Sequence, residues 1–188
     1  MRKIRAFIGV EFDDDTKKAI AELQNQLKPY ASQGRWKFVD NLHLTLNFLA
    51  EVSPEQQEKI DELLRNICLS HQPFQLSLTD PGIFAGQHSV RVLWLGLAGD
   101  TKALQALQRE IEKALVPVGF SAEKRGFSPH ITLGQDLVLK TGFDQVKAKV
   151  SPVLVRPFWV DRLFLFKSEQ IQNRRIYTKV SEYRFSLH

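Results

Sequence analysis

Two segments of the chain share a pattern in which apolar residues alternate with a His and a Thr. The first is residues 41–49 (Asn-Leu-His-Leu-Thr-Leu-Asn-Phe-Leu) and the second is residues 127–134 (Phe-Ser-Pro-His-Ile-Thr-Leu-Gly). Successive side chains of a β-strand point to opposite faces, so the pattern predicts two strands, each with an apolar back and a polar front. The front is expected to carry His43 and Thr45 in the first strand, and His130 and Thr132 in the second. The back is expected to carry Leu42, Leu44, Leu46 and Phe48 in the first strand, and Ile131 and Leu133 in the second.

The rest of the chain shows the two hydrophobic periods that distinguish strands from helices. Period-two alternation predicts further strands at residues 4–10, 36–39, 74–78, 89–97, 157–166 and 176–187. Helical spacing predicts three helices, which open at residues 13–16, 53–56 and 99–101 and whose apolar stripes end at Leu27, Ile67 and Leu115. Residues 80–82 (Asp-Pro-Gly) are expected to break or bend their strand, and residues 136–149 alternate poorly.

The order of these elements predicts the fold class. Several strands follow one another as hairpins, which favours an α+β fold with mostly antiparallel sheets. The two His-x-Thr strands are separated by nearly half the chain length, which suggests two similar halves facing each other with one motif from each. No linker, low-complexity tract or tight tandem repeat interrupts the sequence, so we expect residues 1–188 to form a single domain.

Composition limits the class of protein and of partner. With 43% hydrophobic residues and thirteen Phe in 188 residues, the chain can bury a sizeable core. A net charge of +5 favours an anionic partner through long-range attraction but does not by itself establish nucleic-acid binding. The single cysteine, Cys68, excludes an internal disulfide framework and is expected in the core of the second helix.

The sequence shows no sign of export or membrane insertion. No apolar run approaches the roughly 18 residues that span a bilayer. The basic start at residues 1–5 is followed by a short apolar stretch and then by acidic residues, which argues against a signal peptide. We therefore expect a cytoplasmic protein without membrane contact, and a monomer.

The paired motifs suit phosphodiester chemistry. One neutral imidazole can accept a proton from an attacking hydroxyl or water, while a second, protonated imidazole donates a proton to the departing oxygen. Both forms of His exist near neutral pH. The Thr beside each His offers a hydroxyl to the non-bridging phosphate oxygens, where charge grows in the transition state. This scheme requires no metal and no other cofactor.

Competing kinds of site have weaker support. A metal centre at His43 and His130 needs a further ligand, and Asn47 and Asp136 are poor candidates. The chain contains no Gly-x-Ser-x-Gly elbow, no phosphate-binding loop and no Gly-x-Gly-x-x-Gly fingerprint. The acidic run at residues 13–15 is better explained as a helix cap than as a metal site, since adjacent residues there point in different directions. Surface positions are expected for His71 and His88, and His188 is terminal.

Paired His-x-Thr strands in a chain of this length resemble the 2H phosphoesterase superfamily. The further details are similar to its bacterial and archaeal branch of RNA 2′,3′-cyclic phosphodiesterases, once described as 2′-5′ RNA ligases. The resemblance covers nearly the whole chain and rests on residues 5–11, 41–49, 51–52, 91–96, 125–133, 165–168 and 175–178.

The resemblance implies a bilobal fold with a water-filled cleft between two antiparallel sheets and helices on the outside. It implies metal-free opening of an RNA 2′,3′-cyclic phosphate to a 2′-phosphate and a 3′-hydroxyl, on RNA ends or small cyclic nucleotides. By the resemblance, His43 protonates the departing 3′-oxygen and His130 activates water, although the residues themselves leave that order open. The implied substrate-binding residues are Thr45, Thr132, Arg125, Phe127 and Tyr177, of which the last three also fit a surface cation and two core aromatics.

One position departs from the family pattern. The family commonly has Arg two residues after the last apolar position of the second motif, where this chain has Gln135. Loss of that cation weakens the hold on phosphate or the RNA backbone unless nearby cations such as Arg125 compensate. Two alternatives therefore stay open beside hydrolysis: 2′-5′ joining of RNA ends by the reverse reaction, and a non-catalytic RNA-binding or phosphate-binding module.

Overall fold

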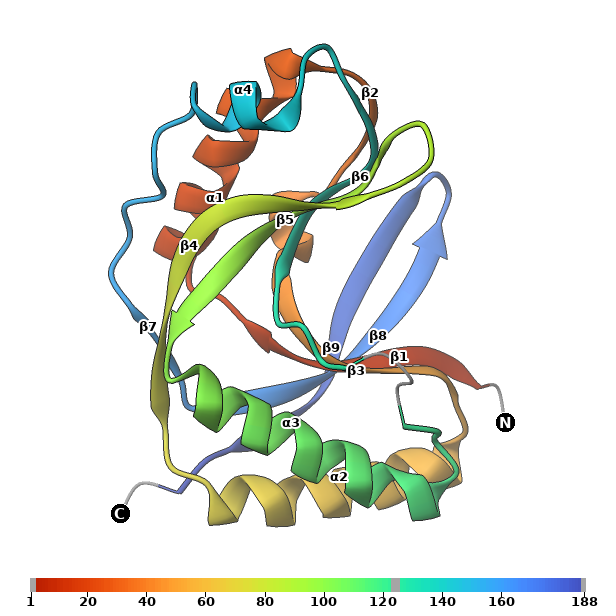
Figure 1. The fold of residues 1–188 in the computed structure, drawn as a ribbon. Helices are drawn as coiled ribbons and strands as arrows, with labels where there is room; N and C mark the ends of the chain where they lie inside the picture. The colour runs from red at the N-terminus through yellow and green to blue at the C-terminus, as the bar shows by residue number, and fades with distance from the viewer. Residues whose placement is uncertain (1–2, 123–125, 187–188) are drawn as a thin grey trace.

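The structure is a computed structural model that describes residues 3–122 and 126–186. Two antiparallel sheets form its two lobes (Figure 1). The four-stranded sheet has the order β3 (His43–Val52), β1 (Ile4–Glu11), β8 (Arg162–Ile171), β9 (Arg174–Arg184). The five-stranded sheet has the order β2 (Ala31–Trp36), β6 (Ile131–Leu139), β5 (Val90–Gly99), β4 (Phe74–Ala85), β7 (Phe158–Val160). The predicted α+β class with antiparallel sheets is confirmed.

Each sheet has its own pair of helices on the outside of the molecule (Figure 1). α1 (Asp14–Leu27) and α4 (Phe143–Lys147) lie beside the five-stranded sheet, and α2 (Pro54–Ser70) and α3 (Thr101–Leu115) lie beside the four-stranded sheet. Short 3-10 turns follow α1 at Lys28–Tyr30, precede β3 at Val39–Asn41 and follow α3 at Val116–Val118. The termini of the described chain lie on opposite sides of the lobe that carries α2 and α3 (Figure 1).

The helices begin where capping chemistry predicts. The Asp13 side chain accepts a hydrogen bond from the backbone N–H of Thr16, so the acidic run caps α1. Ser53 caps α2 in a reciprocal capping box with Gln56, and Pro54 occupies the first helical position. Cys68 is buried in α2 as expected.

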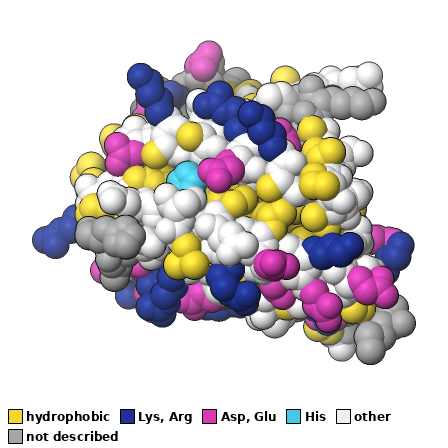
Figure 2. Space-filling view, turned by 90° about the horizontal axis from the view of Figure 1, so that it is seen from below, with side chains coloured by type: hydrophobic (Ala, Val, Ile, Leu, Met, Phe, Trp, Pro, Cys, Tyr) yellow, Lys and Arg dark blue, Asp and Glu magenta, His cyan; other side chains and the backbone are white. Residues whose placement is uncertain are grey.

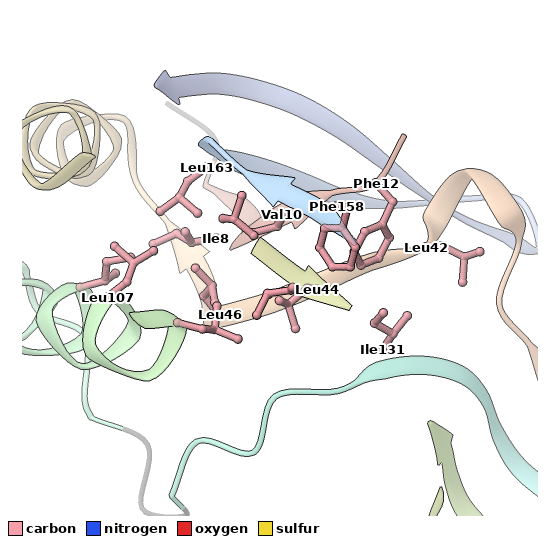
Figure 3. Close-up of a cluster of buried hydrophobic side chains, with 14 of the residues drawn as sticks. Ile8, Val10, Phe12, Leu42, Leu44, Leu46, Leu107, Ile131, Phe158 and Leu163 are labelled. Carbon is pink, nitrogen blue, oxygen red and sulfur yellow. The ribbon is translucent and has the colours of Figure 1, made fainter. Parts of the chain in front are cut away.

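One continuous cluster of buried side chains joins the two lobes. It includes Ile8 from β1, Leu44 from β3, Leu107 from α3 and Ile131 from β6 (Figure 3). The strands β3 and β6, which belong to different sheets, contact each other. The backs of the two motif strands therefore share one core, and burial of these backs turns the fronts the other way.

Two predicted strands differ from those observed. Instead of residues 36–39, β2 comprises residues 31–36 (Ala-Ser-Gln-Gly-Arg-Trp), and Val39 belongs to a 3-10 turn. β2 is a mostly exposed edge strand that is held by its pairing with β6, so it carries no apolar alternation. The single strand predicted at residues 157–166 is two strands in different sheets, β7 and β8, with a break at Asp161. Hydrophobic alternation does not reveal which sheet a strand joins.

The side chain of Phe48 was predicted on the apolar back of the first motif strand, and this prediction is wrong. Phe48 is 53% exposed, whereas Leu42, Leu44 and Leu46 are buried. The pairing of β1 with β3 shifts register twice, once on either side of Phe48. Such a bulge adds a residue and reverses the faces beyond it, which turns Phe48 to the front of the strand.

Two further segments can be compared with the sequence pattern. The strand at residues 74–78 continues as β4 to Ala85, with a register shift between Leu78 and Pro81 where a bend was expected. The poorly alternating residues 136–149 contain the end of β6 and the short helix α4. None of the described helices combines the length and the apolar character needed to cross a bilayer. Seen from the side of α2 and α3, the surface carries interspersed acidic, basic and apolar side chains (Figure 2).

Removal of a buried side chain behind the first motif provides a test of the shared core. We expect Leu44→Ala to lower the free energy of unfolding by about 3 kcal/mol, because Leu44 is fully buried and its loss leaves a cavity. The matched control is Leu154→Ala, at a side chain that is 90% exposed, which should change stability by less than roughly 0.5 kcal/mol. Urea unfolding measures both, and equal effects of the two substitutions would contradict the assignment of Leu44 to the core.

Candidate active site

His43 is the first residue of β3 and is held at both ring nitrogens. Its Nδ1–H donates to the main-chain carbonyl of Asn41 at 2.7 Å. A carbonyl only accepts, so Nδ1 carries a proton, and in the neutral ring Nε2 accepts the Thr45 hydroxyl at 2.8 Å. The Asn41 side chain donates to the carbonyl of Arg175 on β9 at 2.7 Å. These bonds fix the orientation of the His43 ring relative to both edge strands of its sheet.

Three aromatic rings from neighbouring strands surround the His43 imidazole. Phe7 on β1 is tilted against it with the ring centroids 4.5 Å apart, and Tyr177 on β9 meets it edge-on at 5.0 Å. Phe166 on β8 lies at 6.1 Å. Burial among these rings is the main cause that lowers the pKa of His43 to about 4; the nearby Lys37 and His130 contribute in the same direction, and the hydrogen bond to Asn41 acts against it. His43 is therefore neutral at pH 7 in the free protein.

His130 repeats the arrangement in the other lobe. It directly precedes β6, and its Nδ1–H donates to the main-chain carbonyl of Ser128, two residues earlier, at 2.7 Å. In both motifs the same bond therefore selects the tautomer that leaves Nε2 for a reacting proton. Phe84 on β4 meets the His130 ring edge-on at 5.2 Å. Strand alternation identified both histidines, although the observed strand begins one residue after His130.

The space between the lobes has two arms that meet at Thr45 and Phe48, since both residues line both cavities. The apolar arm, of about 480 Å³, contains His130 together with Phe84, Phe120 and Phe127. The basic arm, of about 670 Å³, contains His43 and Tyr177 together with Arg5, Arg35, Lys37 and Arg175. One cleft thus presents a histidine from each lobe, with the Thr45 hydroxyl at the junction.

The structure places the other predicted site residues as follows. Tyr177 lines the basic arm, where burial raises the pKa of its phenol, and half-buried Phe127 lines the apolar arm. Thr132 is half-buried on β6 opposite Trp94 of β5 and is not among the described residues that line either arm. Arg125 lies outside the described residues. His88 is exposed. His71 is hydrogen-bonded through Nε2 to the carboxylate of Glu110 on α3 at 2.7 Å and lines neither arm among the described residues.

Several residues of the cleft were not predicted from the sequence. The cations of the basic arm come from three segments: Arg5 from β1, Arg35 and Lys37 from β2 and its end, and Arg175 from β9. Only Arg5 could have been placed from the sequence, because it lies two residues before Phe7 in the same strand and the two side chains therefore share a face. The others are brought together by strand pairing between distant segments, which no local pattern reveals.

Within the part of the chain that the structure describes, no three His, Cys, Asp or Glu side chains are grouped so as to hold a metal ion. The side chains gathered at the junction of the two arms are imidazole and hydroxyl groups, which suit proton transfer and hydrogen bonding to an anion.

A family model described as the 2′-5′ RNA ligase superfamily matches residues 12–172. The crystal structure of E. coli LigT in apo form superposes with a TM-score of 0.82 at 26% identity over the full length of both chains. The complex of the same protein with 3′-AMP gives a TM-score of 0.81 at 25% identity, again over both full chains.

The chain belongs to the 2′-5′ RNA ligase superfamily. It is similar to the RNA 2′,3′-cyclic phosphodiesterase of Methanocaldococcus jannaschii, with 31% identity over 96% of this chain and 100% of that protein. It is also similar to the RNA 2′,3′-cyclic phosphodiesterase of Methanothermobacter thermautotrophicus, with 31% identity over 71% of each chain. These matches confirm the predicted family and the prediction of an enzyme.

The depressed pKa of His43 makes stability depend on pH in a defined direction. A histidine in the unfolded chain titrates near its ordinary pKa of about 6.5, above the folded value of about 4. Between these values the unfolded chain binds more protons, so we expect the free energy of unfolding to rise as pH increases from about 4 to about 6.5. Replacement of His43 by Gln should flatten this rise, whereas the exposed-site control His88→Gln should not.

Two measurements check this expectation. Urea unfolding at pH values of about 4.5 and about 7 gives the stability difference for each variant. An NMR titration of the imidazole carbon-bound protons gives the midpoint of His43 directly. A midpoint near the ordinary value of about 6.5 would contradict burial of the ring among Phe7, Phe166 and Tyr177.

Proposed function

We propose that this protein hydrolyses RNA 2′,3′-cyclic phosphate ends to 2′-phosphates, with His43 and His130 as the acid–base pair and no metal. The observation that carries the proposal is the repeated geometry of the two histidines. In each, Nδ1–H donates a hydrogen bond to the main-chain carbonyl two residues earlier, so that Nε2 is the nitrogen left for the shared cleft. Similarity to enzymes named RNA 2′,3′-cyclic phosphodiesterase supports the reaction, and the likeness to a protein that binds 3′-AMP supports a nucleotide ligand.

In the proposed reaction, His130 takes a proton from a water molecule whose oxygen attacks phosphorus. The bond from phosphorus to the 3′-oxygen breaks, and His43 transfers its proton to that oxygen, leaving a 2′-phosphate and a 3′-hydroxyl. The Thr45 hydroxyl, released from Nε2 of a protonated His43, donates to a non-bridging oxygen. Thr132 is assigned the same task in the other lobe.

His43 must gain a proton before it can act as the acid. The free ring is neutral because its aromatic surroundings disfavour charge. An anionic phosphate beside Nε2 favours the imidazolium strongly, because the His43 ring is buried and solvent screens the two charges only weakly there. Substrate binding and protonation of His43 are therefore coupled, so the acid forms only when there is a phosphate to receive its proton.

Further features of the proposal concern the whole protein. The shared core of the two lobes supports one domain over residues 1–188, since Leu44 of β3 and Ile131 of β6 lie in one buried cluster and the two strands contact each other. Cytoplasmic location and the monomeric state stay predictions from the sequence. Size-exclusion chromatography with light scattering tests the latter.

The decisive measurement is hydrolysis of adenosine 2′,3′-cyclic phosphate in excess chelator, with the product identified by phosphorus NMR. Wild type should release the 2′-phosphate. We expect His43→Ala and His130→Ala each to lower kcat by about 10²- to 10⁴-fold, because each removes one proton transfer. The control His88→Ala, at an exposed histidine, should retain full activity. Loss of wild-type activity on chelation would contradict a metal-free reaction, and RNA binding without turnover would favour a binding module.

The two threonines give a separate prediction. Replacement of Thr45 by Val keeps the shape of the side chain and removes the hydroxyl that faces the phosphate. We expect kcat to fall by about 10²-fold, as for the loss of a hydrogen-bond donor to a developing anion. Thr132→Val tests the assignment to the other lobe, where Thr132 is paired with Trp94 in the register of β6 with β5. Unchanged kcat in Thr132→Val would remove Thr132 from the set of phosphate ligands.

Coupling of binding to protonation is also measurable. Addition of adenosine 2′-phosphate should raise the NMR titration midpoint of His43 from about 4 toward neutrality. An unchanged midpoint, together with full activity, would show that His43 acts as the base and His130 as the acid.

A further inference from the structure

The apolar arm also contains polar side chains that the proposed mechanism does not use. Asn47 lines it from β3, and Gln108 and Glu112 line it from α3, which contacts β3. Gln108 Nε2 donates a hydrogen bond to the Glu112 carboxylate at 3.5 Å. In small-molecule sites, a few polar groups placed in a mostly apolar cavity decide the orientation and the identity of the ligand. These side chains are therefore candidates for selecting among ligands that react in the same way.

The side-chain oxygen of Asn47 is a buried acceptor without a donor. The residue is only 9% exposed, and its Oδ1 has no hydrogen-bond partner among the described residues. A buried acceptor in this state destabilises the free protein until a donor reaches it. The terminal torsion of an Asn side chain is soft, so the amide can turn its oxygen toward a group in the arm. Asn47 is therefore suited to accept a hydrogen bond from an N–H group of a ligand.

A bulge in β3 buries this amide. Consecutive residues of β1, Ile8 and Gly9, pair with residues 47 and 45 of β3, which leaves Leu46 as an extra residue. Leu46 and Asn47 are neighbours in the chain and are both buried, which regular alternation on a strand with one open face does not produce. Bulges next to active sites re-aim side chains. Here the bulge turns an amide away from solvent, and this amide lines the apolar arm.

The rest of the arm suits an uncharged aromatic ring. Phe84, Phe120 and Phe127 line it, and its volume is about 480 Å³. Thr45, which contacts the phosphate in the proposed reaction, lines the same arm, so the base of the reacting nucleotide reaches the arm through its own ribose. Stacking on aromatic side chains tolerates every base, because each base has a π-face. The rings alone therefore do not choose between bases, whereas a hydrogen bond to the edge of the base does.

We propose that Asn47 determines base specificity: its Oδ1 accepts a hydrogen bond from the exocyclic amino group of the terminal base, so that ends carrying cytosine or adenine are preferred over ends carrying uracil or guanine. This inference rests on the proposed function and adds a choice of base, which the reaction at the phosphate does not require. Cytosine and adenine present an amino group where uracil and guanine present a carbonyl oxygen. An oxygen that faces Oδ1 leaves two acceptors unpaired and disfavours binding.

The test compares two pairs of substrates in the full-length protein, each pair alike in shape. Cytidine is paired with uridine 2′,3′-cyclic phosphate, and adenosine with inosine 2′,3′-cyclic phosphate, in which a carbonyl oxygen replaces the amino group. Wild type should show a kcat/KM about tenfold or more higher for the member with the amino group. The difference should lie mainly in KM, because the hydrogen bond forms in the ground state and in the transition state alike. Equal kcat/KM values within the cytidine–uridine pair would overturn the inference.

Two substitutions of Asn47 separate reading of the base from a structural role. Asn47→Leu removes the acceptor at similar size and should bring the cytidine-to-uridine ratio of kcat/KM to about 1. Asn47→Asp keeps an acceptor oxygen at the same place and should retain the preference. The control Asn66→Leu, at an exposed amide on α2, should leave kcat/KM unchanged for both substrates. A structural role predicts equal losses with both substrates, so an unchanged ratio in Asn47→Leu would overturn the inference.

Failure of the proposed function gives a different result from failure of this inference. Hydrolysis of all four nucleotides with equal kcat/KM overturns the inference and leaves the proposed function standing. If wild type hydrolyses none of them, the proposed function fails, and isothermal titration calorimetry with cytidine 2′-phosphate and uridine 2′-phosphate tests Asn47 by binding alone. Tighter binding of the cytidine nucleotide, lost in Asn47→Leu, supports the inference, and equal affinities overturn it.

Discussion

Burial of the apolar residues that flank the two histidines is the constraint on which the cleft depends. Leu42 and Leu44, the sequence neighbours of His43, are buried. Ile131 and Leu133, which come one and three residues after His130, are buried too. Because alternate side chains point to opposite faces, this burial turns His43 and Thr45 in one lobe and His130 in the other toward the cleft. The lobes share one core, so the same apolar contacts that stabilise the fold also bring the motifs together.

The position of His43 opposes the protonation that its assigned role requires. Phe7, Phe166 and Tyr177 exclude water from the ring and lower its pKa to about 4. The bond to Asn41 favours the imidazolium but does not offset this burial. In the proposed reaction, an anion in the cleft supplies the missing stabilisation. The aromatic surroundings therefore make the acid form of His43 conditional on an occupied site, and the same surroundings strengthen its interaction with phosphate.

The motif strands could be predicted from the sequence because their determinants are local. Alternation placed His43 and Thr45 on one face, and capping residues marked the starts of α1 and α2. Phe48 was misplaced because a bulge depends on the pairing of β3 with β1, which is a contact between distant segments. The short polar strand β2 was missed for a similar reason, since its stability comes from hydrogen bonding to β6.

The basic arm could not be predicted from the sequence, although the net charge could, because it too depends on contacts between distant segments. Arg5, Arg35 and Arg175 are distant in the chain and lie on β1, β2 and β9, which belong to both sheets. Their approach depends on the packing of one lobe against the other. The net charge of +5 is modest for a protein of this size. Four of the cations line the arm that contains His43, so the positive charge in the cleft is concentrated there. Similar histidine motifs therefore stand in unlike electrostatic surroundings, basic around His43 and mostly apolar around His130.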